Sequence, residues 1–490
     1  MLHCEGWQCC AQGFRSIACL LAVTCVLLAS CVEGNREPTE ADLSAFGTFV
    51  DSLDTSLQGK WFDRMGVSSD ADSFLSFLRS ELPVHGLDTT AFFVPQIAED
   101  LQIVHLLAFD SVGVSINEVL PRLDSLLSKA YVSYVTGQRY GFVQPEKLFN
   151  HLNIKAGSSE YARLFDEEVK IPDPKEAEQK LTSSDRMSYL MASHPEGYVY
   201  QALQRQLTKT TDKDQRHKIA VNMERCRWQM KHPGETERKV LVNIPSQQLW
   251  AVAPDSVLDM RICCGATTNK TPLLHSAISY MQVNPEWIIP HNIVKTDVAR
   301  HGGDSAYFAR HRYYIIERSS GDTLNPAEVT SGEMVSGRLR IGQRGGAGNS
   351  LGRIVFRFPN NFAVYLHDTN NRSAFNRDKR TLSHGCVRVQ KPFELACFLL
   401  PDADEWTKDR LRISMDIHPE TTQGQAYVRE HAGAQKPFRL ISYQDVTPKV
   451  PLYIIYYTAY PNPKTGVVEL WPDLYGYDQT ISREMGSILL

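Results

Sequence analysis

The spacing of apolar residues changes from a helical to a strand period near residue 238, and this change constrains the fold most. Before it, SINEVLPRLDSLLSKAYVSYVTGQ (115–138) has apolar residues at the intervals of an amphipathic helix. After it, RKVLVNIPSQQLWAVAPDSVLDMRICCGAT (238–267) alternates and is rich in β-branched residues, as strands are. A chain of 490 residues can form two or three domains. We therefore expect a multidomain α+β protein, helical over residues 45–235 and mainly β over residues 236–480.

Three segments of the β half have patterns of their own. Residues 271–340 mix helix and strand signals and are interpreted as an insertion that caps the site. KPFELACFLL (391–400) predicts a helix with Pro392 in its first turn and Phe393, Ala396, Cys397 and Leu400 on one buried face. VPLYIIYYTAY and VVELW predict a hairpin around PNPKTG (461–466).

The charge balance excludes one broad class of function. The formal net charge is −4 and 22% of the residues are charged. Nucleic-acid-binding proteins usually have a clear basic excess, so we expect no nucleic-acid partner.

The N-terminal segment predicts export. FRSIACLLAVTCVLLASC (14–31) has one basic residue and then an apolar run whose length suits a signal peptide better than a membrane-spanning helix. Its last four residues, LASC, resemble a bacterial lipobox, which implies a signal peptide over 1–30, lipidation of Cys31 and a polar tether over 31–44. The alternative is an ordinary signal peptide. We expect a periplasm-facing lipoprotein of the bacterial envelope, held in the outer membrane.

Five cysteines would remain after removal of the signal peptide and lipidation of Cys31: Cys226, Cys263, Cys264, Cys386 and Cys397. The number is odd, so at least one thiol is predicted to stay free in a compartment that permits disulfides. Cys263 and Cys264 are adjacent on a predicted strand, so they should point to opposite faces and not pair. Cys397 is interpreted as a core thiol.

Two short segments place a cysteine and a histidine together. In FAVYLHD (362–368), period-two alternation puts Phe362, Val364 and Leu366 toward the core and turns Tyr365 and His367 to the opposite face. In SHGCVRV (383–389), an extended chain after Gly385 places Cys386 and Arg388 on one side. If the two strands are adjacent, they present a thiol, an imidazole, a phenol and a guanidinium to one cleft.

The residue types suit nucleophilic catalysis, although spacing alone leaves alternatives. A thiol with a pKa of about 8.5 is mostly protonated at neutral pH, and a nearby imidazole can take its proton. Gly385 allows close backbone approach, so the amides of Gly385 and Cys386 are candidate oxyanion donors, and Arg388 can bind a carboxylate. Zinc ligation or a structural role for Cys386 stay open on this evidence.

A resemblance to a known family favours nucleophilic catalysis over the other two roles for Cys386. The Ser-His-Gly-Cys motif, separated from His367 by fifteen residues, resembles the signature of the L,D-transpeptidase (YkuD-type) family. TPLLHSAISYMQVNPEWIIP, RLRIGQRGGAGNSLGRIVFRFPNNFAVYLHDT and VPLYIIYYTAYPNPKTGVVELWPDLYGYD resemble its large YcbB-like subgroup, and DSLLSKAYVSYVTGQRYGFVQPEKLF resembles the helical scaffold of that subgroup. The motifs of the peptidoglycan-binding module typical of the subgroup are missing between residues 160 and 225.

The resemblance implies a role for each site residue. Cys386 corresponds to the nucleophile, His367 to the general base, His384 to an orienting histidine, and Gly385 and Tyr365 to the oxyanion hole. Substrate contacts are implied for four residues: Arg388, Ser383, Trp287 and Asn349. His301 and His311 are interpreted as surface or lid residues.

The implied activity is peptidoglycan cross-linking. A cysteine thioester would release D-alanine from a tetrapeptide stem and pass the stem to the third residue of its neighbour, giving a 3→3 cross-link. The expected partners are donor and acceptor stem peptides and, through the lipid, a membrane; no cofactor or metal is expected. Carbapenems are expected to acylate the thiol. The alternatives are an L,D-carboxypeptidase or D-amino-acid exchange enzyme, and a non-catalytic cell-wall scaffold.

Overall fold

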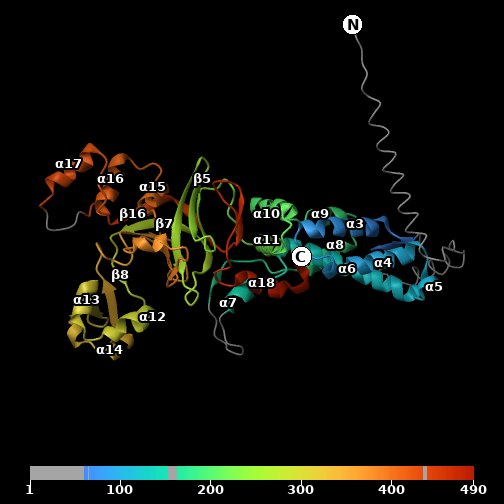
Figure 1. Cartoon of the computed structure of the whole chain (residues 1–490), viewed down its shortest axis with the longest axis horizontal. Coiled ribbons are helices and arrows are strands. Elements are labelled where there is room, and N and C mark those ends of the chain that lie inside the picture. The colour runs from blue at the N-terminus through green and yellow to red at the C-terminus, as the bar shows by residue number, and fades with distance from the viewer. Residues whose placement is uncertain (1–59, 64–65, 153–162, 434–438) are drawn as a thin grey trace, which may run out of the picture. The chain divides into compact units, whose positions relative to one another are not determined.

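The structure, a computed structural model, describes residues 60–63, 66–152, 163–433 and 439–490. The predicted signal peptide, tether and Cys31 lie outside these residues. Within them the chain forms two units. The first comprises the described residues up to Pro83 with Asp88–Val135 and Asp173–Ser193, and the second comprises Val84–Leu87, the described residues of 136–172 and those from His194 onward. The predicted order, a helical region followed by a mainly β region, is confirmed (Figure 1).

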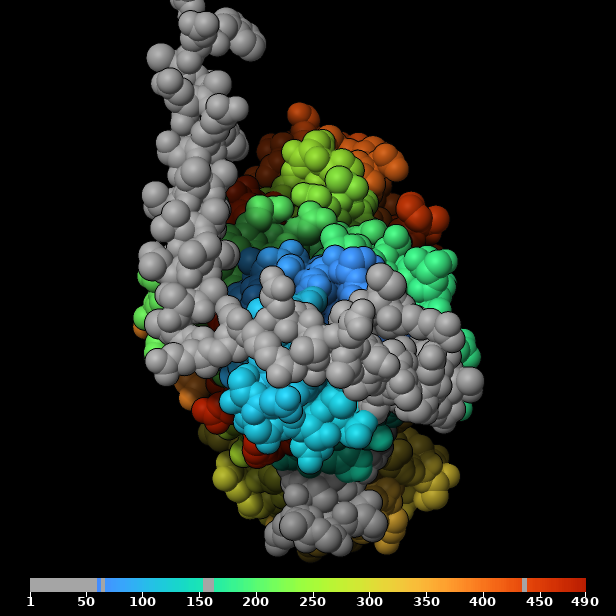
Figure 2. All heavy atoms as spheres, turned by 90° about the vertical axis from the view of Figure 1, so that its right-hand side faces the viewer, coloured from blue at the N-terminus to red at the C-terminus, as the bar shows by residue number. Residues whose placement is uncertain are grey.

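Helices packed around an aromatic core form the first unit. Trp61 stacks on Phe74 of α3 (Ser69–Val84), with ring centroids 5.3 Å apart, and Tyr131 of α6 (Ile116–Tyr140) meets both rings edge-on. Arg186 places its guanidinium 4.6 Å from the Trp61 ring. The remaining helices are α4 (Val94–His105), α5 (Phe109–Val112), α8 (Pro174–Leu181) and α9 (Arg186–Met191). Side chains of α4 and α5, cyan in Figure 2, form one continuous surface.

A ten-stranded sheet organises the second unit. Its order is β12-β13-β15-β6-β5-β4-β16-β7-β3, β14 pairs with β6, and a further pairing of β12 with β7 closes eight strands into a ring. The strands are β3 (Phe165–Asp166), β4 (Lys239–Asn243), β5 (Gln248–Ala253), β6 (Ser256–Gly265), β7 (Leu273–Val283), β12 (Ile354–Arg357), β13 (Leu366–His367), β14 (Thr381–Ser383), β15 (Val387–Val389) and β16 (Tyr443–Ile455).

Helices cover this sheet through apolar contacts. Leu203 and Leu207 of α10 (Tyr198–Lys209) and Met223 of α11 (Lys213–Arg227) share a buried core with Trp250 and Tyr453 of the sheet. The other helices of the unit are α7 (Pro145–Asn150), α15 (Pro392–Leu399), α16 (Glu405–Ser414), α17 (Thr422–Glu430) and α18 (Tyr477–Met485). No helix among the described residues has the length and apolar character needed to cross a bilayer.

A smaller four-stranded sheet with its own core emerges from the second unit. Its strands are β8 (Trp287–Ile288), β9 (Tyr313–Glu317), β10 (Thr323–Leu324) and β11 (Leu339–Gln343), accompanied by α12 (His291–Ile293), α13 (Ser305–His311) and α14 (Ser331–Val335) (Figure 1). We call residues 287–343 the aromatic subdomain. The insertion expected at 271–340 is thus narrower at its start, because residues 273–283 form β7 of the main sheet.

Local predictions in the β half have mixed outcomes. The C-terminal hairpin is confirmed as β17 (Ala459–Pro461) and β18 (Val468–Leu470). Cys263 and Cys264 are both free and buried. The helix α15 forms as predicted, but it buries Leu395, Ala396 and Leu399. Cys397 is only partly buried, so its interpretation as a core thiol is wrong.

The strand predicted over residues 362–368 is reduced to Leu366–His367. Ala363 has a φ of +54°, which interrupts the extended chain. The Asn360 side chain supports this turn: its Oδ1 accepts from the amides of Phe362 and Val364, and its Nδ2 donates to the Val364 carbonyl at 2.8 Å. The side-chain amide therefore replaces ladder hydrogen bonds, which the alternation of apolar residues did not predict.

Candidate active site

A cavity of about 440 Å³ collects most of the predicted site residues. Seven of them line it: Trp287, Tyr365, His367, Ser383, His384, Cys386 and Arg388. The aromatic subdomain forms part of its wall through Tyr307 and Tyr313 as well as Trp287, and Phe362 adds a fourth ring. The cavity therefore joins a polar floor, built on the main sheet, to an aromatic wall.

Parallel pairing of β13 with β15 brings the two motifs together. Leu366 lies opposite Val387 and His367 opposite Arg388, as expected for adjacent strands. Val387 is 1% exposed, whereas Cys386 and Arg388 are only partly buried and line the cavity. The alternation predicted for SHGCVRV is confirmed.

The turn before Cys386 depends on Gly385 and Ser383. Gly385 has a φ of +116°, a conformation that side chains with a Cβ rarely adopt. The Ser383 hydroxyl donates to the Cys386 carbonyl and accepts from the Gly385 amide at 3.2 Å. The Gly385 N–H is therefore occupied in this structure, which leaves the Cys386 N–H as the candidate oxyanion donor of this turn.

His367 is held as a neutral imidazole. Its Nδ1–H donates to the Asp368 carbonyl, which leaves Nε2 as the basic nitrogen. Burial and then the positive charge of Arg388 lower its pKa to about 3, against the opposing carbonyls of Asp368 and Leu351. The side chain is unprotonated at neutral pH and available to accept a proton.

Cys386 is held as a thiol. Burial raises its pKa to about 11, although the Tyr365 amide and hydroxyl and the charges of Arg357 and Arg388 oppose this shift. Among the described residues no hydrogen bond joins its Sγ to His367. Proton transfer from Cys386 to His367 is therefore unfavourable in the free protein.

Tyr365 connects Cys386 with the aromatic subdomain. Its hydroxyl contacts both Cys386 and Trp287, and its ring lies 4.5 Å from the Arg357 guanidinium and 5.8 Å from the His367 ring. Burial raises the pKa of Tyr365, so the side chain remains a phenol that can donate a hydrogen bond to an oxyanion.

Arg388 and His384 both line the cavity, but Arg388 is the more deeply buried of the two. The Arg388 Nε is buried and has no hydrogen-bond partner in the part of the chain that the structure describes. The His384 side chain is 42% exposed, and its Nε2 lies 3.6 Å from the Asp297 carboxylate of the aromatic subdomain. Arg388 is thus the better placed to bind a substrate carboxylate inside the cavity.

Asn349, predicted to contact substrate, does not line the cavity. It is fully buried, its Nδ2 donates to the Arg344 carbonyl at 3.1 Å, and its Oδ1 accepts from the Leu351 amide at 2.7 Å. Its neighbours Ser350 and Leu351 do line the cavity. Asn349 therefore shapes the loop that carries those residues.

Sequence reasoning missed the aromatic wall. Tyr307 and Tyr313 lie in AYFARHRYY, whose density of rings was the available signal. His301 stacks on Tyr307 with ring centroids 3.7 Å apart, and His311 lies 4.4 Å from the same ring. These histidines belong to the aromatic subdomain, as expected for lid residues.

Comparison with known proteins agrees with this geometry. Residues 237–408 match the family model of the L,D-transpeptidase catalytic domain, and residues 55–207 match that of a scaffold domain. A curated protein of Haemophilus influenzae, named "Putative L,D-transpeptidase", is 32% identical over 268 residues. The aligned stretch covers 54% of this chain and 49% of the relative, so the chain spans about half the length of the protein it matches. The chain carries an L,D-transpeptidase catalytic domain of the YkuD family, preceded by a scaffold domain.

Proposed function

We propose that this protein cross-links peptidoglycan stems through a thioester at Cys386. The observation that carries the proposal is the parallel register of β13 and β15, which brings Cys386, His367 and Arg388 to one cavity. A thiol, a neutral imidazole, a phenol and a guanidinium are the groups that acyl transfer from a charged peptide needs.

The first half-reaction forms the acyl-enzyme. The Cys386 sulfur bonds to the carbonyl carbon that links the third stem residue to its terminal D-alanine, and His367 takes the thiol proton. The oxygen becomes an oxyanion, bound by the Cys386 N–H and the Tyr365 hydroxyl. When the carbonyl re-forms, the amide C–N bond breaks, His367 returns the proton to the leaving nitrogen, and D-alanine departs.

The second half-reaction transfers the acyl group. The side-chain amine of a third residue on a neighbouring stem attacks the thioester and gives a proton to His367. A second oxyanion forms in the same place. Its collapse breaks the C–S bond, re-forms the Cys386 thiol with that proton, and leaves a 3→3 amide. Neither half-reaction consumes ATP.

The large difference between the two pKa values suits this order of events. A pKa of about 11 for Cys386 and about 3 for His367 keeps both groups neutral until a substrate is bound. Negative charge then develops on the substrate oxygen, where donors are waiting, and not on an isolated sulfur. This arrangement slows the reaction of the thiol with other electrophiles, because the thiolate is the reactive form.

We further propose that the catalytic domain faces the periplasm from a lipid at Cys31. The support is the apolar run and the LASC sequence within residues 14–31. Labelling of expressing cells with a radioactive fatty acid tests this directly: wild type should incorporate the label and Cys31→Ala should not. Absence of label in wild type would contradict lipidation.

The proposed activity is tested by intact-protein mass after incubation with a carbapenem. Wild type should gain the mass of one carbapenem, because the opened β-lactam stays attached as a thioester, and Cys386→Ala should gain nothing. Cys397→Ala is the matched control, since it removes another partly exposed thiol that does not line the cavity. Purified tetrapeptide stems then decide the acceptor: cross-linked dimers support the proposal, whereas tripeptides alone indicate a carboxypeptidase.

A further inference from the structure

A buried threonine outside the catalytic motif holds the turn that carries Cys386. Thr271 is fully buried, and its hydroxyl donates to the Gly385 carbonyl at 2.8 Å while accepting from the Gly265 amide at 2.8 Å. We propose that Thr271 is a positioning residue that orients the Cys386 N–H as an oxyanion donor. The inference rests on the proposed acyl transfer at Cys386 and adds a residue that the family motif does not contain.

Peptide geometry connects the threonine with the donor. The Gly385 carbonyl and the Cys386 N–H belong to one peptide unit, which is planar and trans, so the two groups point in opposite directions. A hydrogen bond from Thr271 to that carbonyl therefore sets the direction of the N–H on the other side. Gly385 lacks a Cβ and leaves the unit free to rotate, so an external tether is needed.

Thr271 is itself held from a second direction. The Tyr475 hydroxyl donates to the Gly265 carbonyl at 2.7 Å and accepts from the Thr271 amide at 3.2 Å. The strand end and the threonine approach so closely that a Cβ on Gly265 would lie 2.6 Å from the Thr271 nitrogen and 2.2 Å from the Asn269 oxygen. Only glycine fits at position 265, and the two hydroxyls close a ring of hydrogen bonds.

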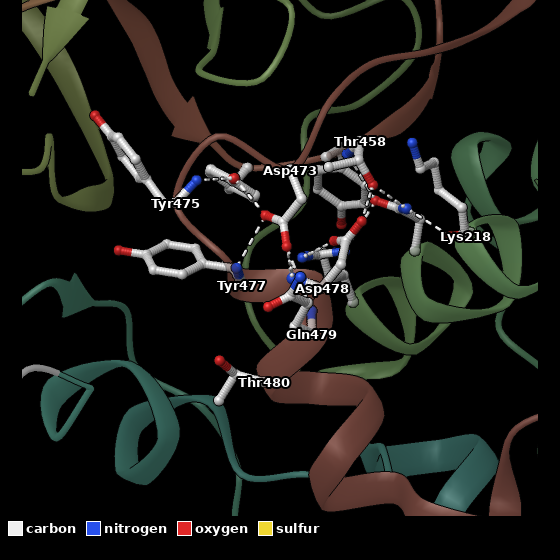
Figure 3. A network of polar contacts seen from close by, with 12 residues as sticks. Lys218, Thr458, Asp473, Tyr475, Tyr477, Asp478, Gln479 and Thr480 are labelled. Atoms are coloured by element: carbon white, nitrogen blue, oxygen red, sulfur yellow. Dashed lines mark hydrogen bonds and ion pairs between the residues drawn. The ribbon is translucent and has the colours of Figure 1, made fainter. Parts of the chain in front are cut away.

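The backbone of Tyr475 is held by a hydrogen-bond network around the Asp473 carboxylate (Figure 3). The Tyr456 hydroxyl donates to Asp473 at 2.6 Å and accepts from the Tyr475 amide at 2.7 Å. Asp473 also accepts from the amides of Tyr477 and Asp478, each at 2.9 Å, at the start of α18. Figure 3 shows the Tyr475 ring extending away from Asp473. The network therefore holds the Tyr475 backbone, while the hydroxyl at the other end of the side chain contacts Thr271.

The same network continues into a helix of the second unit. Asp478 accepts from Arg225 of α11 at 2.6 Å and from the Thr458 hydroxyl, which in turn accepts from Asn222 at 2.7 Å. These groups are buried or half-buried, so breaking one leaves others without partners. Thr271 is therefore the last member of a connected scaffold that ends at the catalytic turn.

The test compares two reactions of the same thiol in the full-length protein. Acylation by a carbapenem develops an oxyanion and needs the donor, whereas alkylation by iodoacetamide displaces iodide and forms no oxyanion. Thr271→Val removes the hydroxyl at nearly constant shape, and Thr271→Ser retains it. We expect Thr271→Val to lower the maximal acylation rate at least tenfold with little change in half-saturating carbapenem, because loss of a donor outright costs about 10²–10³-fold.

The controls separate positioning from loss of structure. Alkylation of Cys386 should stay within about twofold of wild type in both variants, and Thr271→Ser should keep acylation within about threefold. If Thr271→Val and wild type were acylated at equal rates, the inference about Thr271 would be overturned and the proposed function would stand. The same would follow if the acylation and alkylation rates of Thr271→Val fell in parallel. If the valine variant does not fold, Thr271→Ala replaces it, and the ratio of its acylation rate to its alkylation rate is compared with that of wild type. A wild type that is alkylated but never acylated would overturn the proposed function as well.

Discussion

His367 and Arg388 occupy the same register position on the parallel strands β13 and β15. The guanidinium is therefore next to the imidazole for a structural reason, and after burial it is the largest cause of the low His367 pKa. The same charge also lowers the pKa of Cys386, which burial raises. One arginine thus acts on the pKa values of both side chains, and its Nε has no hydrogen-bond partner among the residues that the structure describes.

Replacement of this arginine should move the pH dependence of acylation. His367 must be unprotonated to accept a proton, so activity falls as pH drops through its pKa. Arg388→Gln removes a positive charge that lowers this pKa, and the acidic limb of the rate profile should therefore move to higher pH. Carbapenem acylation rates measured across the acidic range, with Arg388→Lys as the matched control that keeps the charge, check this. An unchanged limb would show that Arg388 does not act on His367.

Loss of the Tyr365 hydroxyl should slow acylation without unfolding the protein. The hydroxyl contacts Cys386 and Trp287, and as a phenol it is one of two candidate oxyanion donors. Tyr365→Phe keeps the ring beside Arg357 and should lower the maximal acylation rate by about 10²-fold. Trp287→Phe, which removes the indole donor to Tyr365 together with part of the aromatic surface, should have a smaller effect. Equal losses in the two variants would place the catalytic contribution in the contact between these side chains.

The two motif histidines should differ sharply in importance. His367 is buried in the cavity and carries the available basic nitrogen, whereas His384 is 42% exposed beside Asp297. His367→Gln should lower the acylation rate by roughly 10²–10⁴-fold, the usual contribution of a general base. His384→Gln should lower it much less. Single-turnover acylation kinetics distinguish them, and the reverse order would transfer the role of base to His384.

The buried carboxylate of Asp409 should make the free energy of unfolding depend on pH in the acidic range. Asp409 of α16 accepts hydrogen bonds from Arg412, the Glu420 amide and the Thr421 amide and hydroxyl, at 2.6–2.9 Å. Burial raises its pKa, but these donors outweigh burial and lower the pKa from 3.8 to about 2. The folded state therefore gains stability above pH 4 that it loses as pH falls toward 2.

Asp409→Asn should remove this contribution. We expect a loss of about 2 kcal/mol in the free energy of unfolding at neutral pH, since each pKa unit corresponds to about 1.4 kcal/mol. The difference from wild type should shrink by roughly 1 kcal/mol by pH 3. Denaturant unfolding at both pH values measures it. Glu405→Gln is the control, because it changes an exposed carboxylate of the same helix and leaves the donors to Asp409 in place. A difference that does not depend on pH would contradict the assignment.

The sequence by itself determined the elements and the reacting groups. Periodicity distinguished α6 from β4, β5 and β6, and alternation in SHGCVRV placed Cys386 and Arg388 on one side with Val387 opposite. These features follow from local chain geometry, in which each residue points to a face fixed by its neighbours. The Cys and His residues were recognisable for the same reason, since their chemistry depends on residue type and short spacing.

Only the tertiary structure decided how those groups are supported. Thr271 meets Gly385 across 114 positions and Tyr475 meets Gly265 across 210 positions, and no local pattern marks either contact. Asn349 turned out to shape a loop, and Tyr307 and Tyr313 reached the cavity from the separate aromatic subdomain. Such contacts depend on which strands pair and how loops close over them. The pKa values of Cys386 and His367 were equally beyond the sequence, because burial is their largest cause.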